Sequence, residues 1–175
     1  MHIEHAQSGT NDITVAFHIR RGDKVYGNNA ESPIYSENLY VQKLYDVIPN
    51  HMSIGSVKHC FVATDEYNVT VGIKDELRAT GFECQIHYLV RPNTDKNNPP
   101  SRNRIDENIQ FMAELYSMIH ASIFVGTFSS NVGALVAPLR GCLGAPRSGY
   151  QREDEESSNH YFESYAVDRD DWHII

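Results

Sequence analysis

Residues 13–20 form a β-branched and aromatic segment that contains His18, and this segment ends in the charged run Arg20-Arg21-Gly22-Asp23-Lys24. A guanidinium keeps its charge at every ordinary pH, and its fork of N–H donors suits a carboxylate or a phosphate. Such a group is costly at the end of a buried strand unless it meets an anion. We therefore predict that Arg20 or Arg21 binds a phosphate. The alternative is a structural network in which both arginines pair with carboxylates such as Asp23, Asp65 or Glu66.

A second polar cluster, Ser129-Ser130, stands where a helix is expected to begin. Serine is a good N-cap, and the first turn of a helix offers unpaired N–H groups and a positive dipole end that together favour a phosphate. The alternative is a plain N-cap that faces the core. The chain contains neither G-x-G-x-x-G nor G-x-x-x-x-G-K-[ST], so a nicotinamide fingerprint and a P-loop are both unsupported.

His18 lies two residues before Arg20, which places both on one face of a strand. Its ring can therefore point a nitrogen toward the same ligand. A buried histidine bonded to backbone is an equally good interpretation of the position.

Strand-like and helix-like segments alternate along the chain. Residues 13–20, 60–64, 83–90 and 122–127 have the pattern of short buried strands, and residues 37–48, 71–80, 104–120 and 130–139 have helical spacing, with Gly81 at the C′ position of the second helix. This order predicts an α/β fold, namely a Rossmann-like parallel sheet with helices on both faces and right-handed crossovers.

In such a sheet, ligands bind outside the carboxyl ends of the strands. The polar clusters at residues 20–24, 65–66 and 127–131 all follow predicted strands, so we expect them to line one edge. The length of 175 residues predicts a single domain over residues 1–175, with its core at about 13–140. In the remainder, 141–175, residues 151–159 form an acidic polar loop, and residues 161–168 with Trp172 are candidates to return to the sheet.

Composition excludes several classes of function. A net charge of −8 argues against broad nucleic-acid binding, and no apolar run is long enough to span a bilayer.

Three cysteines without C-x-x-C spacing indicate neither a zinc site nor a closed disulfide framework, so we predict that they are small apolar residues of the core. The first twelve residues carry no readable secretory signal, which predicts either a cytosolic protein or an incomplete chain.

Three motifs in order, His18-Ile-Arg-Arg-Gly-Asp-Lys24, Phe61-Val-Ala-Thr-Asp65 and Thr127-Phe-Ser-Ser130, make the sequence resemble the α1,6-fucosyltransferase family of GT-B-like enzymes. The resemblance covers about residues 13–139. It implies the nucleotide-binding half of a GT-B glycosyltransferase, which transfers fucose from GDP-fucose to a glycan hydroxyl with inversion. It further implies that no metal or other cofactor is required, and that the enzyme works in the Golgi lumen.

The resemblance also implies roles for particular residues. His18 is expected at the guanine end and Arg20 at the β-phosphate, while Asp65 matches the acidic position after the second strand. Glu114 falls where the family has a guanine-binding aspartate. The remaining assignments are a supporting or catalytic role for Arg21, Asp23 and Lys24, and phosphate contact for Ser130 beside Ser129.

The sequence departs from the family in two ways. Asn28 stands where the family has its catalytic glutamate, and an amide cannot act as a base, so Glu31 is the nearest substitute unless it is a surface acid. The family also has an N-terminal α/β domain, a stem and a membrane anchor, and we expect none of these within residues 1–175. The alternative function is therefore a catalytically silent or incomplete GDP-sugar-binding module. We rank a third possibility, an Arg21-Gly22-Asp23 adhesion motif, far lower because it lies at a predicted strand end within a cleft.

Overall fold

The computed structural model describes residues 13–21, 33–48, 54–90, 104–143 and 163–167. Five strands lie within these ranges: β1 (Ile13–Ile19), β2 (Val57–Thr64), β3 (Gln85–Tyr88), β4 (Ile123–Gly126) and β5 (Glu163–Ala166). The helices are α1 (Glu37–Val47), α2 (Tyr67–Ala79), α3 (Arg104–His120) and α4 (Asn131–Leu143), together with a short 3-10 turn, η2 (Ile54–Ser56).

The five strands form one parallel sheet in the order β3-β2-β1-β4-β5. Strand β1 is central: Phe17 pairs with Val62 of β2 on one side and with Val125 of β4 on the other. Strands β2 and β3 are added on one side of β1, and β4 and β5 are then added on its other side. The predicted α/β, Rossmann-like fold is confirmed. The reversal between β1 and β4 is the place where such sheets open a crevice for ligands.

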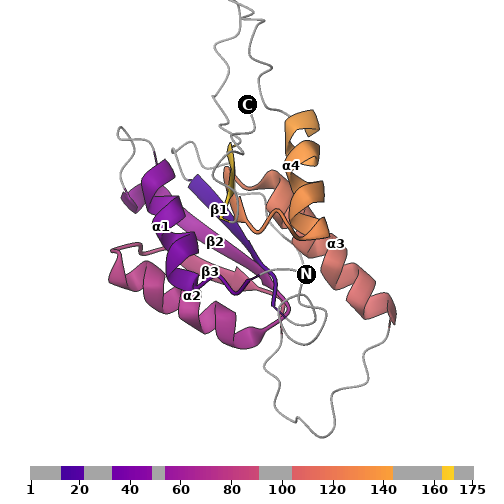
Figure 1. The fold of residues 1–175 in the computed structure, drawn as a ribbon, viewed down its shortest axis with the longest axis horizontal. Helices are drawn as coiled ribbons and strands as arrows, with labels where there is room; N and C mark the ends of the chain where they lie inside the picture. The colour runs from indigo at the N-terminus through magenta and orange to yellow at the C-terminus, as the bar shows by residue number, and fades with distance from the viewer. Residues whose placement is uncertain (1–12, 22–32, 49–53, 91–103, 144–162, 168–175) are drawn as a thin grey trace, which may run out of the picture.

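Helices cover both faces of the sheet, with α1 and α2 on one side and α3 and α4 on the other (Figure 1). We call these sides the α1/α2 face and the α3/α4 face. Successive residues of β1 serve opposite faces, since Val15 and Phe17 belong to the core with α1 and α2 while Ala16 packs with α3 and α4. Burial on both faces explains why most residues of β1 are apolar.

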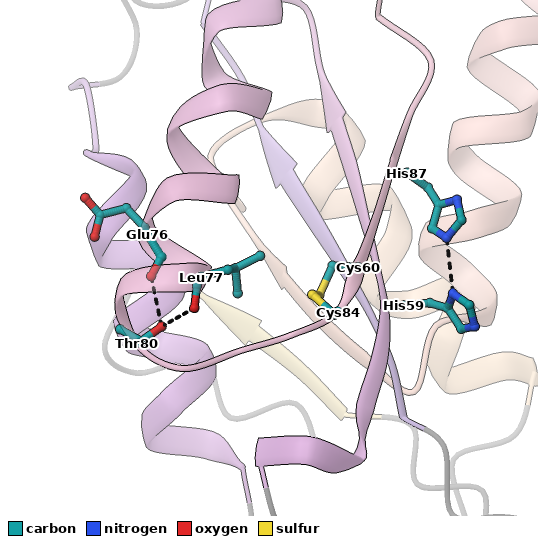
Figure 2. Close-up of a disulfide and its surroundings, with 7 residues drawn as sticks. All are labelled: His59, Cys60, Glu76, Leu77, Thr80, Cys84 and His87. Carbon is teal, nitrogen blue, oxygen red and sulfur yellow. Dashed lines mark hydrogen bonds between the residues drawn. A yellow bond between two sulfur atoms is a disulfide. The ribbon is translucent and has the colours of Figure 1, made fainter.

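Helix α2 ends at the predicted glycine. Gly81 has a φ of 87°, a left-handed conformation that glycine adopts without steric penalty. The Gly81 N–H donates to the Arg78 carbonyl at 3.1 Å and the Phe82 N–H donates to the Leu77 carbonyl at 2.8 Å, which is the Schellman pattern. The Thr80 hydroxyl also donates to the Glu76 carbonyl (Figure 2). The turn sets the direction in which the chain enters β3.

Several element boundaries differ from the prediction. Helix α2 begins at Tyr67 rather than at residue 71, because Val69 and Thr70 are already buried in its first turn. Helix α4 runs to Leu143 and passes through Pro138, which lacks an N–H and so cannot donate to the helix ladder at that position. Strand β2 begins three residues earlier than expected, at Val57.

The C-terminal part of the chain supplies an extra strand. Strand β5 pairs in parallel with β4, with Tyr165 opposite Val125. The predicted return of residues 161–168 to the sheet is confirmed for residues 163–166. The acidic stretch 151–159 and Trp172 lie outside the described residues, and the single domain over residues 1–175 stays a prediction. None of the described helices is long and apolar enough to cross a bilayer.

The prediction that the cysteines form no disulfide was wrong. Cys60 in β2 and Cys84, just before β3, form a disulfide with their Cα atoms 6.0 Å apart (Figure 2). The two residues are separated by 24 positions because all of α2 lies between them, so their spacing carries no recognisable motif. Sheet pairing brings them together, since Cys60 is aligned with Ile86, two residues after Cys84. The core assignment does hold for Cys60, which is fully buried.

A buried arginine that the sequence did not single out joins three elements. Arg140 of α4 is 2% exposed and donates to the carbonyls of Met118, Ile119 and Ala121 at 2.6–3.0 Å, which lie at the C-terminal end of α3. It also donates to the Ser164 hydroxyl of β5 at 2.9 Å. The last carbonyls of a helix have no partner within the helix, and a cation favours that end. Burial lowers the pKa of Arg140 to about 10, which leaves it charged at neutral pH.

Candidate functional site

The carboxyl ends of β1 and β2 are joined through Asp65. One carboxylate oxygen of Asp65 accepts a hydrogen bond from the Arg21 backbone N–H at 2.9 Å, and the other lies 3.1 Å from Nη1 of Arg20. The first and second motifs therefore meet at one edge of the sheet, as the alternation of strands and helices predicts. Asp65 orients the backbone that leaves β1 and holds the Arg20 guanidinium beside it.

The third motif is bonded to the same edge. The Thr127 N–H donates to the His18 carbonyl at 3.2 Å, so the turn after β4 lies directly beside the end of β1. The Ser130 carbonyl accepts from Ala134 N–H at 2.9 Å, which makes Ser130 the N-cap residue of α4. The N-terminal end of α4 is consequently placed at the β1/β4 reversal, where its unpaired N–H groups favour an anion.

A cavity of about 160 Å³ opens between this edge and the α3/α4 helices. Four predicted site residues line it, from three separate elements: His18, Arg20, Asp65 and Glu114. His18 is buried at 6% exposure, on the α3/α4 side of β1. Val132 closes the cavity from the first turn of α4. Ser129 and Ser130 stand at the start of that helix but not among the lining residues.

Two lining residues on α3 were missed by the sequence analysis. Gln110 donates from Nε2 to Oε1 of Glu114 at 3.0 Å and so fixes the orientation of that carboxylate. Phe111 lines the same cavity and is 40% exposed, which leaves an aromatic ring accessible to a planar ligand. Both residues lie three or four positions before Glu114, the spacing that places side chains on one helix face. Their spacing from Glu114 is the feature of the sequence that could have identified them as neighbours of the site.

The two adjacent arginines are in different environments. The Arg21 side chain is only 5% exposed, and its Nη2 donates to the Tyr35 carbonyl at 2.5 Å and to the Glu37 carboxylate at 2.9 Å. Arg20 is 36% exposed and faces the cavity. The internal contacts of Arg21 match the structural alternative considered for it. They also turn its guanidinium inward, away from any receptor that would recognise an exposed Arg-Gly-Asp tripeptide.

Two glycines at the β4–α4 junction allow close packing. A Cβ on Gly133 would collide with the backbone carbonyl of Thr127, so only glycine lets the first turn of α4 approach the end of β4 so closely. A Cβ on Gly126 would lie 2.7 Å from Phe124 and 3.4 Å from Cβ of His18. Close approach of backbone at a helix start is a common reason for glycine in nucleotide-binding folds.

The remaining predicted residues lie outside the described part of the chain. These are Asp23, Lys24, Glu31 and the substituted position Asn28. Among the residues that the structure describes, no group of three or more His, Cys, Asp or Glu side chains is arranged to hold a metal ion. Within the described part of the chain, the candidate site consists of His18, Arg20, Asp65 and Glu114, which line the cavity, together with the N-terminal end of α4.

No protein-family model matches the sequence, and no curated protein matches it. The structure is similar to a crystal structure of the fucosyltransferase POFUT1 with GDP-fucose, with a TM-score of 0.45 and 17% identity over 74% of this chain and 38% of that chain. The POFUT1 apo form gives a TM-score of 0.44 and 18% identity over 74% of this chain and 40% of that chain. This chain thus spans less than half the length of either.

Proposed function

We propose that this chain is the GDP-sugar-binding half of an inverting glycosyltransferase that resembles the α1,6-fucosyltransferases and transfers fucose from GDP-fucose to a glycan hydroxyl. The observation that carries the proposal is that His18, Arg20, Asp65 and Glu114 line one and the same cavity at the β1/β4 reversal. Sequence resemblance assigned donor-binding roles to these residues, and they come from β1, β2 and α3.

The guanine base is assigned to the α3 side of the cavity. The Glu114 carboxylate, held by Gln110, is an acceptor for two neighbouring N–H groups such as those on the edge of guanine. A cavity of about 160 Å³ suits part of a nucleotide rather than the whole, since pockets for complete small ligands measure roughly 300–1,000 Å³. The phosphates and the sugar would extend outward along the edge.

The diphosphate is assigned to Arg20 and the N-terminal end of α4. Departure of GDP places negative charge on the β-phosphate while the sugar becomes cation-like. A guanidinium and a helix N-terminus stabilise that charge in the transition state without a divalent cation. Arg20 would exchange its contact with Asp65 for the phosphate, and its partial exposure makes such an exchange feasible.

Inversion also requires a base that takes a proton from the attacking hydroxyl. Glu31 is our candidate, because Asn28 occupies the position where the resembled family has its glutamate. Lys24 and Asp23 are assigned supporting roles in the same segment. The glycan acceptor would bind with a second α/β domain, and the Golgi lumen is the proposed compartment. The Cys60–Cys84 disulfide suits an oxidising compartment of this kind.

Calorimetric titration of the full chain with GDP and UDP tests the donor site. We expect GDP to bind, Glu114→Gln to reduce the preference for GDP over UDP at least about tenfold, and Arg20→Ala to weaken both nucleotides through the phosphates. Glu107→Gln, an exposed glutamate on the same helix, and Arg78→Ala, an exposed arginine on α2, are the matched controls. Equal binding of both nucleotides by wild type and Glu114→Gln would contradict the guanine assignment.

A catalytically silent GDP-sugar-binding module is the second candidate, favoured by the amide at Asn28. Transfer of labelled fucose from GDP-fucose to a glycan mixture separates the two functions. The enzyme hypothesis predicts transfer that Glu31→Gln abolishes while GDP affinity is retained. GDP binding without transfer, unchanged by Glu31→Gln, would establish the silent module.

A further inference from the structure

Two histidines face each other on the outer part of the sheet, away from the cavity described above. His59 of β2 and His87 of edge strand β3 are both exposed, and Nδ1 of His59 lies 3.1 Å from Nε2 of His87. Both side chains extend from the face of the sheet opposite to the Cys60–Cys84 disulfide (Figure 2). His87 is aligned with Phe61, which packs with the α3/α4 core, so this is the α3/α4 face where the helices leave it open.

The distance between these nitrogens matches that of two ligands on one metal ion. Imidazole nitrogens bind Zn²⁺ at about 2.0–2.1 Å, so two ligands separated by an angle of about 90–110° stand roughly 2.9–3.4 Å apart. The observed 3.1 Å lies within that interval. At this separation, β2 and β3 need not move closer together for both nitrogens to reach one ion.

The surrounding structure holds this spacing in place. Cys60 follows His59 directly, and its disulfide to Cys84 fixes β2 against the start of β3. The pairing of Cys60 with Ile86 then sets the position of His87 one residue later. Chelation gains most when the ligands are positioned before the ion arrives, since little side-chain freedom is lost on binding.

We propose that His59 and His87 form a two-histidine chelating site for a divalent transition-metal ion of the Zn²⁺ type, in which water fills the remaining positions. The bound ion would link the edge strand β3 to β2 on the face of the sheet opposite to the disulfide. Imidazole suits Zn²⁺, Cu²⁺ and Ni²⁺, whereas Mg²⁺ and Ca²⁺ require oxygen ligands. The site therefore discriminates between these two classes of cation.

Binding requires both facing nitrogens to carry a lone pair. In the ion-free pair one of them donates an N–H to the other, so that ring must move its proton to its other nitrogen when the ion enters.

Titration of the oxidised full chain with ZnCl₂ at pH 7.5, followed by calorimetry, tests the site. Comparison of variants is required because the chain has nine histidines in all. We expect His59→Ala and His87→Ala each to remove one equivalent of bound Zn²⁺ or to weaken it more than about tenfold, since even loss of an outer-shell partner costs 10–100-fold. His120→Ala, an exposed histidine on α3, should behave as wild type. MgCl₂ should give no binding at this site.

Other outcomes would overturn the proposal. Identical Zn²⁺ stoichiometry and affinity in wild type, His59→Ala and His87→Ala would mean that the pair is only a hydrogen bond. A loss in one of the two variants alone would indicate a single surface ligand, and an equal loss in His120→Ala would indicate non-specific binding. Far-UV circular dichroism confirms that each exposed substitution leaves the fold intact. None of these readouts depends on nucleotide binding, so the result is independent of the proposed donor site.

Discussion

The two faces of the sheet use buried polar groups in different ways. On the α1/α2 face the core between sheet and helices is mostly apolar, and the buried guanidinium of Arg21 at its edge donates to the Tyr35 carbonyl and the Glu37 carboxylate. On the α3/α4 face His18 and Glu114 border a cavity, and Arg140 bonds the end of α3. The buried arginine at the α1/α2 face is thus held by internal bonds, whereas the α3/α4 face combines such a structural arginine with polar side chains that line the cavity of the candidate site.

The largest effect is expected at Arg140, because it joins α3, α4 and β5 on the α3/α4 face. Arg140→Met keeps much of the side-chain volume but leaves several buried carbonyls without a donor, and each such loss costs about 1–3 kcal/mol. We expect the free energy of unfolding to fall by about 4 kcal/mol, measured by urea denaturation. Arg78→Met, at an exposed position, should change it by less than about 0.5 kcal/mol. If Arg140→Met lost as little stability as Arg78→Met, water would have to replace Arg140 as the hydrogen-bond donor to these carbonyls.

Leu44→Ala tests the α1/α2 face. Leu44 of α1 is fully buried in the core beside β1, and removal of three carbons there leaves a cavity. The free energy of unfolding should fall by about 3 kcal/mol. GDP affinity measured at a temperature where the variant remains folded should equal that of wild type. A parallel loss of GDP affinity would show that the two faces are not functionally separate.

The sequence predicted those parts of the fold that depend on local patterning. Alternating strands and helices, the Gly81 terminus of α2 and the meeting of three polar clusters at one edge all follow from periodicity and from the geometry of parallel sheets. The Cys60–Cys84 bond and the contacts of Arg140 depend on pairings across the sheet and between helices. A single sequence gives no direct signal for such pairings.

The site shows the same division between local and tertiary information. Strand alternation already placed Arg20 on the same face as His18, although it did not identify the partners of Arg21. Those partners depend on tertiary packing, because the Arg21 guanidinium turns toward α1 and pairs with Glu37. Gln110 and Phe111 line the cavity beside Glu114, but their residue types alone do not distinguish them from other residues of α3. Helical spacing would have identified them if Glu114 had been taken as the reference point.

Gly126→Ala is expected to separate stability from ligand binding within the α3/α4 face. The new methyl group would press against the Phe124 ring and Cβ of His18, and overpacking of this kind costs about 1–3 kcal/mol. Because His18 lines the cavity, GDP affinity should fall more than in Leu44→Ala, although the loss of stability is smaller, about 2 kcal/mol. Calorimetric titration and urea denaturation measure the two quantities. If Leu44→Ala lost more affinity than Gly126→Ala, the assignment of the cavity to the ligand would fail.

The smallest effect concerns His87, on the open part of the α3/α4 face. Its pKa in the folded protein is lowered from 6.5 by burial and by His59, so on acidification the unfolded chain takes up this proton first. The contribution of neutral His87 to the free energy of unfolding is therefore complete above about pH 6.5. It is lost as the pH falls through the lowered pKa that His87 has in the folded protein. His87 is largely exposed, which keeps the effect small.

Urea denaturation at pH 7.5 and pH 5.5, without metal ions, measures this contribution. Wild type should lose more stability between the two pH values than His87→Gln does, because the amide does not titrate. His120→Gln should retain the wild-type difference, since the pair with His59 is intact in that variant. The range stays above the titration of ordinary carboxylates, so His87 is the group that separates the variants. If wild type and His87→Gln lost the same amount of stability between the two pH values, protonation of the histidine pair would not destabilise the folded protein, and the prediction would be wrong.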